Sequence, residues 1–205
     1  RQMMRGTHWR APGERMQSIR RHLALPNPRF VCTDAYDHGE WEVPLSNKAG
    51  GPAGCRALAK LRRIAGPAFV TLSPLYEQFN GLVFHCHGET AGLCVAPAAD
   101  LEELNRDWRS WLVHEDPDQL YEFQRDGFAF ATIEASANYF VVHRGQIYYS
   151  DHDGGDDELW GENLEAFFDR ALSDPVRFLS DAGYYTRYDD GETDVQWIPR
   201  VFVHD

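Results

Sequence analysis

The sequence predicts an α+β fold with a central mixed, largely antiparallel β-sheet and flanking helices. Strand-like runs follow one another as hairpins, and amphipathic helical segments stand between them without strict strand–helix alternation. The composition is 43% hydrophobic and 13% aromatic over 205 residues, which is enough to build a hydrophobic core. This length fits one domain with an elaborate end, or a domain with a small annex.

The N-terminal third predicts a loop-rich segment with few regular elements. The stretches "ALPNPR" and "SNKAGGPAG" are rich in Pro and Gly and are expected to be loops. Between them, "RFVCTD" and "EWEVPL" predict an edge hairpin, and helical spacing over residues 55–65 predicts a short helix ended by Gly66. We expect residues 1–66 to form a basic extension packed on a main domain over residues 67–205.

Stronger helix signals begin near residue 73. Ser73-Pro74 predicts the start of a helix that runs through Phe79, and Asn80-Gly81 predicts its end. The runs "LVFHC" and "AGLCVA" are expected to be strands. Asp100 and Glu103 have the spacing of a capping box. The apolar positions of the helix that follows are Leu101, Leu104, Trp108 and Trp111.

The middle of the chain predicts a helix and then three strands. Asp116-Pro117 opens the helix and Gly127 closes it. The runs "FAFATI", "NYFVVH" and "QIYYS" are expected to be strands, and Arg144-Gly145 makes a tight two-residue turn between the last two.

The C-terminal part predicts two helices and a hairpin. Residues 164–172 have the clearest amphipathic spacing, and Asp174-Pro175 starts a second helix that ends at Gly183. The run "YYTRYDDGETDVQWI" predicts a hairpin around Asp190-Gly191. Its Tyr and Trp side chains are interpreted as core residues, with an exposed interface as the alternative.

An acidic stretch, "SDHDGGDDE", follows the strand "QIYYS". Its carboxylates are Asp151, Asp153, Asp156, Asp157 and Glu158. As a calcium loop that starts at Asp151, it has Gly155 where a ligand is needed and Asp156 where the turn needs glycine. A strand also stands where an EF-hand has a helix. The stretch therefore does not match an EF-hand.

Two other interpretations of the acidic stretch remain. A transition-metal site that includes His152 needs ligands from elsewhere, for which His85 and His87 are candidates. A solvated loop between a strand and a helix needs no ligand, and it places residues 156–158 near the helix start, where carboxylates are favourable. The second interpretation leaves the density of like charges unexplained unless a cation or a basic partner offsets them.

The sequence contains no recognisable catalytic motif. It has no G-x-S-x-G nucleophile elbow, no phosphate-binding loop and no C-x-x-C pair. We therefore predict no catalytic residues, no cofactor and no metal. The N-terminus lacks an apolar signal segment, which favours a cytoplasmic protein and reduced thiols. The four cysteines are Cys32, Cys55, Cys86 and Cys94.

The charge distribution indicates the class of partner. The net charge is −12, divided into +7 for residues 1–65 and −19 for residues 66–205. An acidic domain repels nucleic acid and attracts basic partners. No run approaches the roughly 20 apolar residues of a membrane span. We therefore expect a protein partner and neither a nucleic acid nor a membrane.

Several motifs resemble the SUKH superfamily, the Smi/Knr-type proteins. "LYEQFNGLVF" resembles that family's helix, NG and strand opening, and "FAFATIEASANYFVVHRGQIYYSDHDGGDD" resembles its later core. "LEAFFDRAL" resembles the helix that follows, so the resemblance covers roughly residues 70–180. It implies an α+β fold without catalytic residues. Many bacterial members are immunity proteins that bind and neutralise a cognate polymorphic toxin inside the producing cell.

These observations predict a non-enzymatic intracellular binding protein. The leading hypothesis is an immunity protein whose partner is a basic toxin domain, such as a nuclease. The predicted partner-binding residues are Asp151, Asp153, Asp156, Asp157 and Glu158. The alternatives are a regulatory protein–protein interaction module without a toxin, and a metal-dependent hydrolase. The sequence leaves the oligomeric state open.

Overall fold

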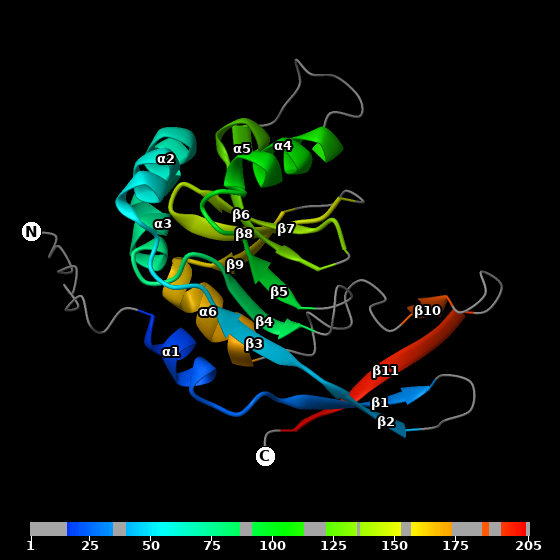
Figure 1. Ribbon diagram of the computed structural model, residues 1–205. Helices are drawn as coiled ribbons and strands as arrows, with labels where there is room; N and C mark the ends of the chain where they lie inside the picture. The colour runs from blue at the N-terminus through cyan, green and yellow to red at the C-terminus, as the bar shows by residue number, and fades with distance from the viewer. Residues whose placement is uncertain are drawn as a thin grey trace, which may run out of the picture.

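Two antiparallel β-sheets, with helices against the larger one, make up the computed structural model (Figure 1). The structure describes residues 16–34, 40–86, 92–112, 122–134, 136–152, 157–173, 186–188 and 194–203. Every strand pairing within these ranges is antiparallel. The predicted α+β class with a central sheet is confirmed.

The larger sheet is a seven-stranded meander in which each strand pairs with its neighbours in the chain. Its strands are β3 (Ser46–Ala49), β4 (Leu82–Cys86), β5 (Leu93–Val95), β6 (Phe128–Ile133), β7 (Tyr139–His143), β8 (Gln146–Ser150) and β9 (Glu158–Gly161). At the β7–β8 turn, Arg144 has φ 51° and Gly145 has φ 85°. Two consecutive positive φ values are typical of the tight turn that suits the twist of a hairpin, as the sequence predicted.

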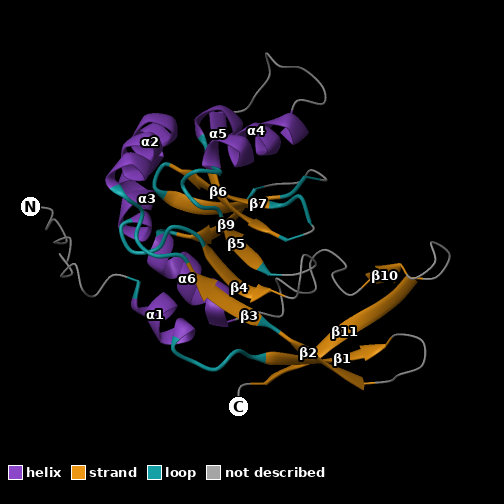
Figure 2. Ribbon diagram, in the orientation of Figure 1, coloured by secondary structure: helices purple, strands orange, loops and turns teal. Residues whose placement is uncertain are grey.

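The smaller sheet joins the two ends of the described chain. Its order is β10 (Thr186–Tyr188), β11 (Asp194–Val203), β1 (Arg29–Asp34) and β2 (Glu40–Pro44). The predicted N-terminal hairpin is confirmed as β1–β2, and the two strands predicted at the C-terminus pair as β10–β11. Figure 2 shows this sheet beside the larger one. Both sheets draw strands from either side of residue 66.

Helices cover both faces of the seven-stranded sheet. They are α1 (Gln17–Leu23), α2 (Cys55–Ala65), the 3₁₀ turn η2 (Gly66–Ala68), α3 (Phe69–Tyr76), α4 (Leu101–Leu112), α5 (Glu122–Asp126) and α6 (Leu164–Ser173). The helices α1, α2, α3 and α6 bury side chains in the main core. On the opposite face, Trp108 of α4 packs with Ala129 and Val141.

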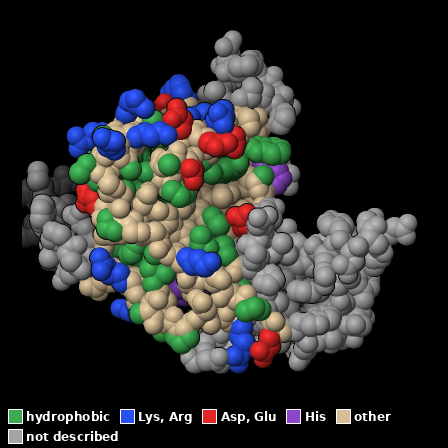
Figure 3. All heavy atoms as spheres, viewed as in Figure 1, with side chains coloured by type: hydrophobic (Ala, Val, Ile, Leu, Met, Phe, Trp, Pro, Cys, Tyr) green, Lys and Arg blue, Asp and Glu red, His purple; other side chains and the backbone are tan. Residues whose placement is uncertain are grey.

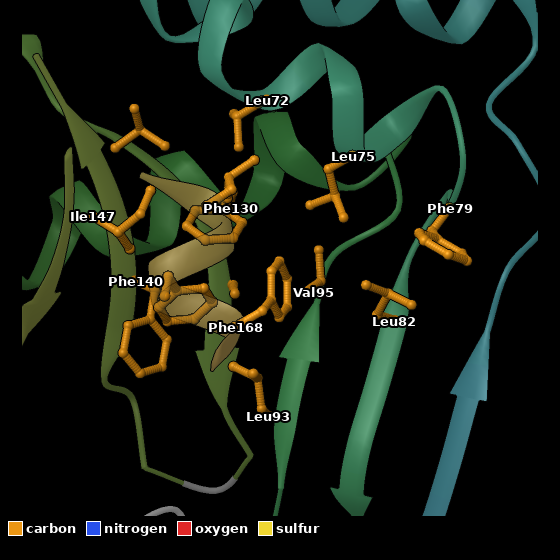
Figure 4. Close-up of a cluster of buried hydrophobic side chains, with 14 of the residues drawn as sticks. Leu72, Leu75, Phe79, Leu82, Leu93, Val95, Phe130, Phe140, Ile147 and Phe168 are labelled. Carbon is orange, nitrogen blue, oxygen red and sulfur yellow. The ribbon is translucent and has the colours of Figure 1, made fainter. Parts of the chain in front are cut away.

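Strands β6 and β7 are buried on both faces, which explains their nearly continuous apolar sequences. Phe130 and Phe140 point into the main core beside Phe168 (Figure 4). The intervening Ala129 and Val141 point to α4 instead. Each fully buried Phe contributes about 1.5–3 kcal/mol to folding, so Phe130 and Phe140 stabilise this central pair of strands.

A buried asparagine joins α4 to β6. The Asn105 side chain, 3% exposed, donates from Nδ2 to the carbonyls of Leu101 and Ala129, at 2.8 Å each. Its Oδ1 accepts the Ala129 N–H at 2.9 Å. Ala129 borders an irregularity in the β6–β7 register. Asn105 therefore satisfies both backbone groups of Ala129, which stay buried beneath the helix.

The predicted helix start at Ser73-Pro74 is wrong. Helix α3 begins at Phe69, directly after the η2 turn, and Pro74 lies in its last turn. Pro74 cannot donate a hydrogen bond to the residue 70 carbonyl, but Val70 is 78% exposed and water can solvate that carbonyl. The helix also ends earlier than expected, at Tyr76 and not at Phe79, although Gly81 does have the positive φ, 97°, that the Asn80-Gly81 signal predicted.

Of the other predicted elements, the loop expected over "SNKAGGPAG" is wrong in its first part, because Ser46–Ala49 pair with β4 as strand β3. The remaining ones named below are confirmed where the structure describes them. Helix α2 spans the expected residues, and Gly66 follows it with φ 52°. The strands predicted over "LVFHC", "AGLCVA" and "FAFATI" and the helix predicted from residue 164 also form. Gly127 directly follows α5, as expected. The predicted helix start at Asp116-Pro117 and the predicted helix from residue 174 to Gly183 lie outside the described residues.

Candidate partner-binding surface

The acidic stretch connects β8 to a strand that the sequence analysis missed. Asp151 is exposed directly after β8, and Asp157 is exposed directly before β9. Asp153 and Asp156 lie outside the described residues. Because β9 lies between them and α6, the predicted position of Asp157 and Glu158 near the start of that helix is wrong. Asn163 caps that helix instead, since its Oδ1 accepts the Ala166 N–H at 3.0 Å.

Strand β9 was hard to predict because it is only four residues long and directly follows the acidic run. Trp160 is its buried anchor, 4% exposed, with its ring centroid 5.0 Å from that of Phe140. Leu159, on the opposite side, is 39% exposed. One buried aromatic residue is too little alternation to indicate a strand from sequence.

Glu158 forms an ion pair within the protein. Its Oε1 lies 2.7 Å from Nη2 of Arg170 in α6. Arg170 also donates from Nη1 to the Leu159 carbonyl at 3.0 Å, and its guanidinium carbon lies 4.2 Å from the centroid of the Trp160 ring. Glu158 therefore helps to hold β9 against α6, whatever part it has in binding a partner.

The start of the acidic stretch is anchored by Asn138, which is 4% exposed. Asn138 Oδ1 accepts the His152 backbone N–H at 3.0 Å and lies 2.8 Å from His152 Nδ1. Asn138 Nδ2 donates to the Tyr149 hydroxyl at 2.7 Å. Because Oδ1 is an acceptor, His152 Nδ1 carries a proton in this arrangement. His152 and Asp151 are thus held at the end of β8.

The sequence predicted Trp111 on the inner face of α4, but Trp111 is 43% exposed. Trp108, one turn earlier, is the buried anchor, and its indole Nε1 donates to Ser150 Oγ at 3.1 Å. Trp111 instead lies edge-on against His152, with 5.6 Å between ring centroids. The inner stripe of α4 therefore stops before the last turn of the helix.

These residues form an acidic and aromatic area that we call the Trp111 surface, consisting of Asp107, Trp111, Asp151 and His152. Asp107 lies four residues before Trp111, on the same side of α4. Burial raises the pKa of the adjacent Tyr139, the Asp107 charge raises it further, and a hydrogen bond with Trp111 partly opposes both effects. A neutral phenol and an indole thus lie among exposed carboxylates.

A second area, on α2, has the opposite charge. Arg56, Arg62 and Arg63 are exposed, and Figure 3 shows Lys and Arg side chains gathered over this helix. The Arg62 guanidinium carbon lies 4.9 Å from the centroid of the Phe69 ring. Part of the basic N-terminal charge predicted from sequence is therefore displayed on a helix that packs in the main core.

Only some of the proposed metal ligands lie within the described residues, and these are not grouped into a metal site. His85 is fully buried in β4, with its ring centroid 4.9 Å from that of His22, and His87 lies outside the described residues. Within the ranges that the structure describes, no group of three or more His, Cys, Asp or Glu side chains could hold a metal ion.

A pocket of about 270 Å³ lies beside β3 and β4, on the core edge away from the acidic stretch. Lys48 is the one ionisable side chain in its described lining, and Asn80 is the other polar side chain there. This lining offers no pair of groups for proton transfer or nucleophilic attack.

No protein-family model and no curated protein matches this sequence. Membership of the SUKH superfamily therefore stays a prediction. Across the described ranges, no helix has both the length and the apolar character that a membrane span requires.

Proposed function

We propose that this protein is a non-enzymatic binding module that docks a basic protein partner on the Trp111 surface. The observation that carries the proposal is Trp111 itself, 43% exposed and packed edge-on against His152. The exposed Asp107 lies one helical turn before Trp111, and the exposed Asp151 adjoins His152 in the chain. Tryptophan is enriched among residues that dominate binding energy, whereas most surface positions contribute little.

The carboxylates around Trp111 favour a basic partner. Complementary charge mainly speeds association and excludes wrong partners, while a central aromatic anchor slows dissociation. Residues 66–205 carry a net charge of −19, so the long-range field has the same sign as the local surface. A basic toxin domain, such as a nuclease with a cationic cleft, has the charge that this surface attracts.

The Trp111 surface is held in place by hydrogen bonds, which favours a role in binding a partner over the alternative of a solvated loop. Asn138 holds His152 by two contacts of 3.0 and 2.8 Å, and His152 in turn packs on Trp111. A surface that is already ordered loses less conformational entropy on binding.

We propose more specifically an immunity-type role, in which binding blocks the active site of a toxin. The resemblance to the SUKH superfamily and the absence of a recognisable catalytic motif in the sequence support this role. A regulatory interaction module would use the same surface without a toxin. The two roles differ in whether the partner is toxic by itself.

Affinity capture followed by co-expression tests the proposal. The immobilised full chain is exposed to an extract of its native cells, in parallel with Trp111→Ala and with Val70→Ala, a matched control at a site 78% exposed on α3. We expect the wild type and Val70→Ala to retain one basic protein that Trp111→Ala loses.

The captured partner is then expressed alone and together with the wild-type chain. An immunity role requires that the partner arrests growth and that co-expression restores it. A partner that is harmless alone would overturn the immunity role and leave the interaction module. Equal capture by Trp111→Ala and the wild type would overturn the proposed surface.

A further inference from the structure

Two cysteine thiols lie in contact on neighbouring strands of the larger sheet. The Sγ atoms of Cys86, at the end of β4, and Cys94, in β5, are 3.6 Å apart. In the strand register Cys94 pairs with Val83, and His85 interrupts β4 with a left-handed backbone at φ 57°. A disulfide bond is about 2.05 Å long, so the two sulfur atoms must move closer together before they can form one.

A carboxylate stands beside this pair. The Cys94 thiol donates to Glu134 Oε2 at 3.3 Å. Glu134 follows β6, and its backbone N–H donates to the Gly92 carbonyl at 2.9 Å, which holds it next to β5. A carboxylate is therefore in direct contact with one of the two thiols.

Glycine at position 92 leaves the space that the Cys86 thiol occupies. A Cβ atom at Gly92 would lie 2.4 Å from Cys86 Sγ and 2.8 Å from its Cα. Gly92 also has φ 120°, a conformation that other residues rarely adopt. The close approach of the two thiols thus depends on a glycine in the neighbouring backbone.

We propose that Cys86 and Cys94 form an oxidisable dithiol, which hydroperoxides convert to an intrachain disulfide between β4 and β5. Cys94 is half-buried whereas Cys86 is 7% exposed, so Cys94 meets the oxidant first. Transient, regulatory disulfides are the kind that reducing compartments permit. The pair would make the chain responsive to oxidation independently of the proposed partner binding.

The chemistry balances with hydrogen peroxide as the oxidant. The Cys94 thiol loses its proton to the solvent and the thiolate attacks one peroxide oxygen. The O–O bond breaks, and the leaving hydroxide takes up a proton from the solvent, which gives a sulfenic acid and water. The Cys86 sulfur then attacks the Cys94 sulfur, the S–O bond breaks, and a second water leaves. Two thiols lose two electrons and two protons, and one peroxide is reduced to two waters.

The surroundings of Cys94 set the rate of this reaction. The hydrogen bond with Cys86, burial, and the adjacent Glu134 all raise the pKa of the Cys94 thiol. Because the thiolate is the reactive form, oxidation is slow at neutral pH. Its rate is expected to rise about tenfold per pH unit while the thiol remains mostly protonated. Glu134→Gln removes a charge that raises the pKa, so this variant is expected to oxidise several-fold faster.

Thiol counting tests the proposal on the full chain. The reduced protein is treated with hydrogen peroxide, and its remaining thiols are alkylated. The mass of the intact protein is then measured by mass spectrometry, and its peptides are mapped. The sequence holds four cysteines, so we expect the number of alkylated thiols to fall from four to two, with a peptide link between Cys86 and Cys94. Four remaining thiols, or a link that involves Cys32 or Cys55, would overturn the proposal.

Variants supply a second readout. Cys55→Ser, at an exposed position that starts α2, is the matched control and is expected to form the same link at an unchanged rate. Cys94→Ser is expected to keep all of its remaining thiols after peroxide. If Cys94→Ser fails to fold, the wild-type peptide map still tests whether Cys86 and Cys94 form the link. Glu134→Gln that oxidises no faster than the wild type would contradict the assigned role of the carboxylate.

Discussion

Single side chains join the layers of this fold by hydrogen bonds that no local pattern reveals. Asn105 bridges α4 to β6, Trp108 reaches Ser150 in β8, and Asn138 fixes the end of β8. Each is a polar group that is nearly or fully buried, and such groups are costly when a partner is lost.

Asn105→Ala is expected to lower the free energy of unfolding by about 2–4 kcal/mol, because it leaves the N–H and C=O of Ala129 buried without a partner. Urea denaturation measures the change. Ser110→Ala, on the exposed side of the same helix, is the matched control and is expected to stay within about 0.5 kcal/mol of the wild type. An equally small loss for Asn105→Ala would show that α4 does not depend on this bridge.

The burial of Tyr76 predicts that the free energy of unfolding falls at alkaline pH. Burial, with a smaller contribution from Asp100, raises the pKa of its phenol, and its hydroxyl donates to the Ala96 carbonyl at 2.6 Å. The Tyr76 phenol therefore has a higher pKa in the folded protein than in the unfolded chain, where it is about 10. Below pH 10 its full contribution to the free energy of unfolding is present, and this contribution is lost as the pH rises above 10.

The unfolding free energy of the wild type is therefore expected to fall above about pH 10, by up to 1.4 kcal/mol per pH unit from this residue. Tyr76→Phe is expected to be less stable at neutral pH, since it loses the bond to the Ala96 carbonyl, and to show a shallower alkaline decline. Denaturation curves from pH 8 to pH 11 measure both slopes. Parallel slopes for the two proteins would contradict this role for Tyr76.

At the scale of elements, β9 and α6 act as one unit. Arg170 contacts the Glu158 carboxylate, the Leu159 carbonyl and the Trp160 ring, which are three consecutive residues of β9. Since β9 ends the acidic stretch, its attachment to α6 sets where that stretch ends.

Arg170→Ala is expected to cost about 1–2 kcal/mol of unfolding free energy, because a half-exposed ion pair, a hydrogen bond and a cation–π contact each contribute modestly. Arg170→Lys keeps the charge but not the forked geometry, so an intermediate loss is expected. Arg125→Ala, whose ion pair with Asp126 is on the surface, is the control. A loss for Arg170→Ala no larger than for Arg125→Ala would mean that the Arg170 contacts do not stabilise β9.

Elements with strong local signals could be predicted from sequence, and elements that depend on distant contacts could not. The β7–β8 hairpin follows from alternating apolar residues around Arg144-Gly145, and α6 from its helical spacing. Strand β9 is short and stabilised by Arg170, twelve residues from Glu158, so its own sequence carries little signal. Ser73-Pro74 looked like a helix start because nothing local shows that η2 has already begun the helix.

The candidate site also has one part that could be predicted from the sequence and one part that could not. The acidic composition around Asp151 and Asp157 is visible in the sequence, whereas the exposure of Trp111 is not, because its spacing continues the apolar stripe of α4. Its packing against His152, and the contact of Cys86 with Cys94, arise only when separate segments are brought together. A tryptophan in the last turn of an amphipathic helix, close to an acidic run, was the available signal.

At the scale of the whole molecule, the protein has two surface areas of opposite charge, which lie on different helices. The basic side chains of α2, a helix of the main core, gather on one area of the surface (Figure 3). The Trp111 surface lies at the end of α4, where Trp111 contacts His152 after β8. The sheet between them is buried on both faces at β6 and β7. A partner can therefore approach the acidic area as a surface on a rigid framework.

Trp111→Ala is expected to weaken binding of the captured partner by roughly 30-fold or more, the size typical of a central aromatic anchor. The loss should appear mainly as faster dissociation, since no charge is removed. Surface plasmon resonance measures it, with Val70→Ala as the control. A dissociation rate unchanged by Trp111→Ala would place the anchor elsewhere.

The association rate as a function of ionic strength tests the central claim most directly, namely that an acidic surface at the end of β8 docks a basic protein. Stopped-flow mixing with the captured partner would compare the wild type with the double variant Asp107→Asn and Asp151→Asn, which removes both carboxylates of the Trp111 surface. We expect the wild-type rate to fall steeply as salt increases, and the double variant to associate more slowly at low salt with a flatter dependence. Identical rates and identical salt dependence for the two proteins would contradict the claim.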